Sequence, residues 1–219
     1  MATSGAENSE RRVLTPGEEI FNSVTHAMGA VLSVAGLVLL LVFSSKQGTV
    51  WHIVGSAVFG SSLVVLYTVS TLYHSVTNVR IKSLFARLDH VAIFLLIAGS
   101  YTPFVLTTLR GPLGWTLFGV IWTLAFMGMI IRSIFLGRFR KLMVSLYLLM
   151  GWLIVIAIVP MTRALPFISI VFLVAGGCCY TFGVVFYIWR QLKFSHGIWH
   201  LFVLAGSICH FFSVLNSFA

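Results

Sequence analysis

The sequence predicts an all-α, polytopic membrane protein with seven transmembrane helices in one bundle, the N-terminus cytoplasmic and the C-terminus outside. Three observations support this fold class: the composition, the spacing of apolar runs and the placement of positive charge. Hydrophobic residues make up 59% of the 219 residues, charged residues make up 9%, and the mean hydropathy is +1.03. A soluble domain carries about 25% charged residues, so lipid is the expected solvent for most of this chain.

Seven apolar runs each approach the length of about 20 residues that crosses a bilayer as a helix. They predict helices over residues 22–44, 51–76, 85–108, 114–135, 142–160, 167–189 and 196–217. The polar breaks between them are short, so we expect residues 21–219 to form a single transmembrane domain. Residues 1–20 are polar and are expected to be a disordered cytoplasmic tail.

The orientation follows from the lysines and arginines in the breaks. Eleven lie on the side of the N-terminal tail and three on the other side, a bias that predicts a cytoplasmic N-terminus. The net charge of +9 therefore indicates topology and contact with lipid headgroups, and we expect no nucleic-acid partner. The last predicted helix contains no lysine for a Schiff base, which argues against retinal.

Asp89 is the single acid that we place in the membrane portion, because Glu7, Glu10, Glu18 and Glu19 fall in the predicted tail. A carboxylate at the centre of a spanning helix costs about 2.5–3.5 kcal/mol. Asp89 is therefore either an acid at the start of a helix that pairs with a nearby arginine, Arg80 or Arg87, or a functional group.

Histidines converge on the same cytoplasmic level from several predicted helices. His196 and His200 are four residues apart, so both imidazoles project from one helix face. Ser70 and His74 have the same spacing, which places a hydroxyl one turn outward of His74. Three imidazoles around one ion, with a fourth position open for water, are typical of catalytic zinc. Iron, copper or nickel would also suit these ligands.

Three further histidines are weaker candidates. His210 lies fourteen residues past His196, about 21 Å along a helix, and cannot share a site with it. His90 points about 100° away from Asp89 and is expected to pack beside it. His26 either supports the site from outside the ligand set or donates hydrogen bonds between helices, and we favour the latter.

These motifs resemble the progestin and adiponectin receptor (PAQR) family, and in particular its bacterial hemolysin III branch. The matching segments, in chain order, are Glu18-Glu19-Ile-Phe-Asn22-x2-Thr25-His26, Ser70-x3-His74, Leu88-Asp89-His90, Gly99-Ser-Tyr-Thr-Pro103 and His196-x3-His200-x9-His210. The resemblance implies a seven-helix protein of the bacterial cell membrane that is linked to membrane lipid homeostasis. It also implies zinc on His74, His196 and His200, a water held by Asp89, and Ser70 as a hydrogen-bonding neighbour.

The resulting prediction is a zinc-dependent hydrolase of a lipid amide or ester, similar to the ceramide hydrolases among the family's receptors, with a membrane lipid as its partner. A first alternative is a non-catalytic membrane regulator with a structural zinc. A second is a cytolysin or pore, as the branch name suggests. The predicted helices lack the polar face of a wide aqueous channel, which argues against the pore.

Overall fold

The structure is a computed structural model that describes residues 14–135, 139–189 and 191–218. Within these ranges the secondary structure is helical and contains no strand. The helices, in chain order, are α1 (Pro16–Gln47), α2 (Val50–Ser75), α3 (Val79–Leu106), α4 (Pro112–Ile134), α5 (Arg140–Trp152), the 3-10 helix η1 (Leu153–Ala157), α6 (Ile158–Ala164), α7 (Phe167–Ile188) and α8 (Ser195–Asn216). The predicted all-α class is confirmed.

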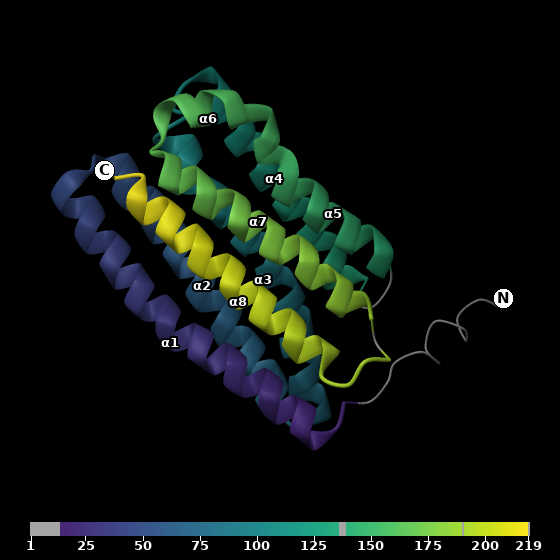
Figure 1. Ribbon diagram of the computed structural model, residues 1–219. Helices are drawn as coiled ribbons and strands as arrows, with labels where there is room; N and C mark the ends of the chain where they lie inside the picture. Colours follow the sequence, from purple (N-terminus) through teal and green to yellow (C-terminus); the bar gives the residue numbers. More distant parts are fainter. Residues whose placement is uncertain (1–13, 136–138, 190, 219) are drawn as a thin grey trace.

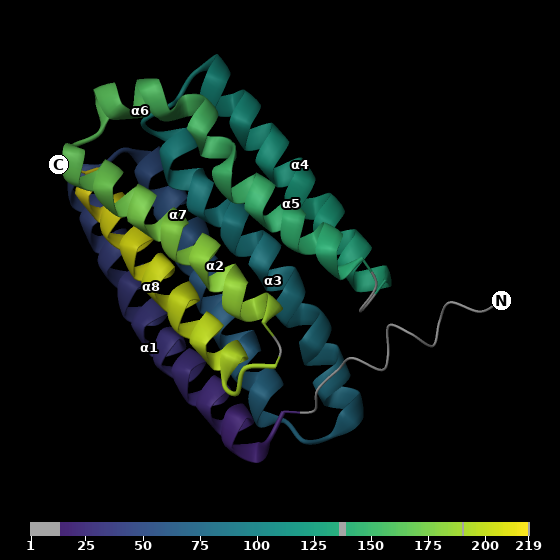
Figure 2. The same cartoon turned by 45° about the vertical axis from the view of Figure 1, so that its right-hand side comes forward.

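The long helices lie side by side in one bundle (Figure 1). α3 packs between α2 and α4, α7 packs on α8, and α1 closes one side of the bundle by contacting both α2 and α8. Figure 2 shows α4 and α5 on the opposite side from α1. The end of α2 and the beginning of α8 therefore meet at one end of the bundle, next to the beginning of α1.

Six stretches of the described chain are long and apolar enough to cross a membrane. They are α1, α2, α4, the combined stretch Arg140–Ala164, α7 and α8. The seventh predicted span corresponds to α3, which is not among the six; Asp89 and three cations lie in its first half. Large apolar side chains cover the outward faces, such as Val31 on α1 and Ile134 on α4, which are 71% and 66% exposed. Such surfaces are expected where the solvent is lipid.

The first helix begins earlier than predicted, at Pro16 instead of residue 22. Thr15 caps it, because its hydroxyl accepts from the backbone N–H of Glu18 while the Glu18 carboxylate accepts from the backbone N–H of Thr15 at 2.9 Å. This capping box satisfies two groups that a helix start leaves free. Residues 16–20, expected in a disordered tail, are therefore helical, and residues 1–13 lie outside the described part of the chain.

The predicted single helix 142–160 is interrupted by η1. Pro160 lacks a backbone N–H and cannot bond to the carbonyl four residues earlier. The hydroxyl of Tyr101 compensates from α3: it donates to the carbonyl of Met150 at 2.6 Å and accepts from the N–H of Ile154 at 2.8 Å. Tyr101 therefore stabilises the break in the α-helix at the point where a membrane offers no water to do so.

A candidate metal centre between α2 and α8

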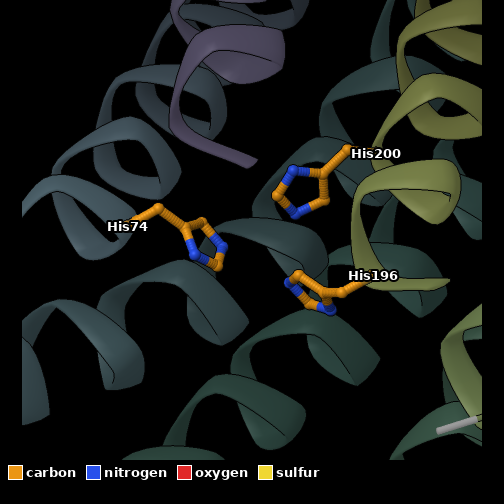
Figure 3. A group of neighbouring side chains, drawn as sticks. All are labelled: His74, His196 and His200. Atoms are coloured by element: carbon orange, nitrogen blue, oxygen red, sulfur yellow. The ribbon is translucent and has the colours of Figure 1, made fainter. Parts of the chain in front are cut away.

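Three histidines meet where α2 ends and α8 begins. His74 lies in the last turn of α2, and His196 and His200 lie in the first two turns of α8. One ring nitrogen of each lies within 4.8 Å of the others, and Figure 3 shows the three rings facing a common space. The structure thus brings together the three residues that the sequence singled out as ligands.

Whether a metal ion fits can be judged from the ring nitrogens that have no hydrogen-bond partner. His74 Nε2, His196 Nε2 and both nitrogens of His200 are buried and have no hydrogen-bond partner. A buried polar atom without a partner costs about 1–3 kcal/mol, so four of them together are expensive in a site without a ligand. Neutral imidazole nitrogens at this spacing suit a transition-metal cation, and the cluster could hold one.

A carboxylate orients one of the rings. Glu19 Oε2 lies 2.6 Å from His74 Nδ1, so this nitrogen carries the proton and Nε2 keeps its lone pair toward the other rings. Lys82 Nζ contacts the second oxygen of Glu19 at 2.9 Å. Carboxylates that hold a metal-ligating histidine in this way are common and fix both tautomer and ring orientation.

Sequence reasoning missed Glu19 because it assigned this residue to the tail. The signal was present: Thr15-Pro16-Gly-Glu18 has the spacing of a capping box with proline in the first turn, which marks a helix start. Recognising it would have moved Glu18 and Glu19 into the bundle. The sequence predicted that Asp89 is the single acid of the membrane portion. This prediction is wrong, because Glu18 lies in the same helical bundle, where it is 2% exposed.

The neighbouring Glu18 positions the start of α8. Its Oε1 accepts from the backbone N–H of Phe194 at 2.9 Å, immediately before the helix that carries His196 and His200. Phe194 has a left-handed backbone with φ of 59°, and its ring packs edge-on against Phe21 of α1. The first turn of α1 therefore contacts both helices of the histidine cluster: Glu19 contacts His74 of α2, and Glu18 contacts the residue that precedes α8.

Asp89 lies on α3 outside the three-histidine group but lines the adjoining cavity. It is 5% exposed. Within the described ranges the ion pairs join Glu19 to His74 and to Lys82, and none joins Asp89 to Arg80 or Arg87. The alternative of an Asp89–arginine pair is therefore wrong.

The remaining candidates take different positions. Ser70 is fully buried one turn before His74, and its hydroxyl has no partner. His26 stacks on His200 with ring centroids 3.5 Å apart. Neither nitrogen of His26 has a partner among the described residues, so the prediction that it donates hydrogen bonds between helices is wrong. His90 turns toward its own helix, where Nδ1 lies 2.6 Å from the carbonyl of Ala86.

A cavity of about 320 Å³ extends from this region through the bundle. Its lining is contributed by α3, the α5–η1–α6 stretch, α7 and α8, together with single residues of α1 and α2. Asp89, His26 and Trp199 lie at the end near the histidine cluster, and Tyr101 and His210 lie farther along. Most of the other lining residues are apolar, so the cavity suits a hydrocarbon chain more than a column of water.

The fold and the cluster define a polytopic α-helical membrane protein with a three-histidine candidate metal centre at one end of its bundle. The model of the haemolysin-III related family (HlyIII) matches residues 15–211, so the chain belongs to this family. The predicted resemblance to the hemolysin III branch is confirmed, and the chain is a multi-pass protein of the cell membrane.

Named relatives agree with this family. The chain is 50% identical over 198 residues to "Hemolysin-3" of Bacillus cereus, covering 90% of each chain. It is 44% identical over 203 residues to "Hemolysin-3 homolog" of Bacillus subtilis (strain 168), covering 93% of this chain and 95% of the relative. It is also similar, at 29% identity over 203 residues, to the human "Monocyte to macrophage differentiation factor", covering 90% of this chain and 83% of the relative.

Proposed function

We propose that this protein is a zinc-dependent hydrolase of a lipid amide or ester that contributes to membrane lipid homeostasis. The observation that carries the proposal is the convergence of three imidazoles with buried, unpaired nitrogens beside an apolar cavity that is also lined by a carboxylate. Histidine ligands, an acid and a chain-sized cavity are the parts that such a reaction needs.

The proposal includes an orientation in the membrane. With α3 as the seventh span, the N-terminus lies in the cytoplasm and the C-terminus outside. The excess of lysine and arginine at the N-terminal end supports this arrangement. The metal centre then lies near the inner face of the plasma membrane, where a lipid headgroup can reach it while the tails remain among the helices.

His74, His196 and His200 would hold the metal, with Glu19 keeping the His74 ring in the required tautomer. Zinc is the best candidate because it accepts all-imidazole ligand sets and leaves a further position open. When bound, it would supply a Lewis acid that polarises the substrate carbonyl and lowers the pKa of water.

The chain's own groups would move the proton and bind the substrate. A carboxylate oxygen of Asp89 would accept a proton from the attacking water and pass it to the leaving nitrogen or oxygen. The unpaired hydroxyl of Ser70 would donate a hydrogen bond within the site. The apolar cavity would bind the acyl chain and keep bulk water away from the reacting carbonyl.

The test is hydrolysis of labelled ceramide-like amides and related esters by purified protein and by Asp89→Asn. We expect the wild type to release labelled fatty acid and the variant to lose at least about 100-fold in rate, with its zinc content unchanged. Equal turnover by both would remove Asp89 from the mechanism. No turnover of any lipid by zinc-loaded wild type would contradict the hydrolase.

One observation favours a second candidate, a non-catalytic regulator with a structural zinc. The cluster joins α2 to α8, so an ion there would also pin two helices together. This candidate predicts that His200→Ala lowers the thermal stability while Asp89→Asn leaves the cellular phenotype intact. A pore finds less support, because the cavity is lined mainly by apolar side chains; leakage from liposomes containing purified protein would test it.

A further inference from the structure

His210 is a partly buried histidine with two buried ring nitrogens, and the proposed reaction does not use it. It lies on α8 and lines the same cavity, and neither of its ring nitrogens has a hydrogen-bond partner. The carbonyl of Leu173 faces the ring without reaching hydrogen-bond geometry. A bare imidazole within a membrane-spanning bundle is costly, so its retention in an apolar cavity calls for a ligand.

The surroundings of His210 accommodate its ring closely. Tyr180 of α7 packs edge-on against it, with centroids 5.3 Å apart. Gly176 leaves the space for the imidazole, because a Cβ at that position would overlap the ring. The hydroxyls of Tyr180 and Tyr67 both pair with Ser207, at 2.9 and 2.8 Å. These hydroxyls satisfy one another, so the imidazole is the polar group left to bind something else.

His210 lies on the same face of α8 as His200, one of the candidate metal ligands. His200, Val203, Ser207 and His210 follow each other at steps of three and four residues and therefore form one stripe along the helix. Val203 and His210 both line the cavity. Ten residues separate His200 from His210, which is about 15 Å along the helix axis. A chain anchored at the histidine cluster would therefore pass His210 at that distance.

We propose that His210 forms a polar subsite that binds a hydroxyl group in the middle of the acyl chain. This inference rests on the proposed function, because it takes the chain's reactive end to lie at the histidine cluster. A carbon–carbon bond is about 1.5 Å long and an extended chain zigzags, so about twelve bonds cover the distance. The preferred lipids are then those whose acyl chain carries a hydroxyl near its twelfth carbon.

The test measures binding of fatty acids, the products of the proposed reaction, by displacement of a fluorescent fatty acid from purified protein. Three probes are compared: octadecanoic acid, 12-hydroxyoctadecanoic acid and 2-hydroxyoctadecanoic acid. We expect the mid-chain hydroxy acid to bind about tenfold more tightly than octadecanoic acid, as one buried hydrogen bond allows. Equal affinities of these two acids in the wild type would overturn the subsite.

Two variants attribute the preference to His210. His210→Phe should bind octadecanoic acid as the wild type does and lose the preference for the mid-chain hydroxyl, whereas His210→Gln should retain part of it. The 2-hydroxy acid, whose hydroxyl lies beside the carboxyl group, should respond to neither variant. A preference that survives in His210→Phe would overturn the proposal.

The subsite and the hydrolase can fail separately, because the binding measurement needs no turnover. A mid-chain preference without hydrolysis of any lipid would contradict the hydrolase and support the subsite. Hydrolysis without such a preference would contradict the subsite alone.

Discussion

Glu19 Oε2 lies 2.6 Å from Nδ1 of His74, so a carboxylate of the first helix orients a candidate metal ligand of the second. The contact couples two residues that are 55 positions apart in the chain. It also leaves Nε2 of His74 as the nitrogen that faces His196 and His200. The predictions below concern this contact and the groups around it.

Replacing Glu19 by Gln should weaken zinc binding by about 10- to 100-fold, the usual effect of removing a carboxylate behind a metal-bound histidine. The amide keeps the shape but no longer stabilises the proton on Nδ1. Competition with a zinc-binding dye would measure the change. Lys82→Met is the matched control: it removes the other partner of Glu19, a partly exposed pair worth at most about 1 kcal/mol, and should change affinity little. Equal effects of both substitutions would contradict the orienting role.

Replacing His196 by Ala should reduce bound zinc from about one ion per chain to nearly none, because two imidazoles do not complete the site. Elemental analysis of purified protein would show the loss. His52→Gln serves as the control, since His52 bonds to Thr49 at the start of α2, outside the cluster. A full zinc complement in His196→Ala would mean that the ion binds elsewhere.

Replacing Ser70 by Ala should lower the turnover of the lipid substrate by about tenfold without lowering stability. Its hydroxyl is buried without a hydrogen-bond partner, so removing it also removes a desolvation cost that no hydrogen bond offsets. Ser62→Ala provides the comparison, because the Ser62 hydroxyl donates to the carbonyl of Phe59 at 2.7 Å and its loss should reduce stability by about 1 kcal/mol with normal turnover. Activity measurements and thermal unfolding in detergent would separate the two effects. A destabilised Ser70→Ala with normal turnover would indicate a structural hydroxyl.

Replacing Tyr101 by Phe should lower the free energy of unfolding by about 2–3 kcal/mol. The variant leaves the N–H of Ile154 without the hydroxyl that accepts from it and removes the hydrogen bond donated to the carbonyl of Met150. Tyr147→Phe loses one bond of 3.2 Å to the carbonyl of His90 and should cost less. Thermal unfolding in one detergent would rank the variants, and the reverse order would contradict the role of Tyr101 at the helix break.

Much of the fold could be predicted because each span is recorded locally as an apolar run of the right length. The histidine cluster was also accessible, since His196 and His200 share a helix face and His74 could be placed at their depth. The break in the α5–η1–α6 stretch was not, because it depends on Pro160 near the end of the run and on Tyr101 from another helix. The contact between Glu19 and His74 was not predicted, because the sequence around Thr15 is polar and was not recognised as a helix start.

The cavity could not be predicted from any single segment. Its shape depends on which side chains of α3, α7 and α8 face one another, and therefore on pairings between distant parts of the chain. For the same reason the expected hydrogen-bonding role of His26 was wrong: its ring stacks on His200 and joins α1 to α8, and no local pattern records that contact.

The candidate metal centre combines residues that are far apart in the chain: Glu19 and His74 come early, and His196 and His200 come late. During synthesis, Glu19 and His74 enter the membrane long before His196 and His200 exist. A ribosome-bound chain therefore has most of its spans but an incomplete candidate metal site, and any metal uptake there would have to follow the insertion of the last helix. A premature stop before α8 would therefore yield a membrane protein that lacks two of the three candidate metal ligands, His196 and His200.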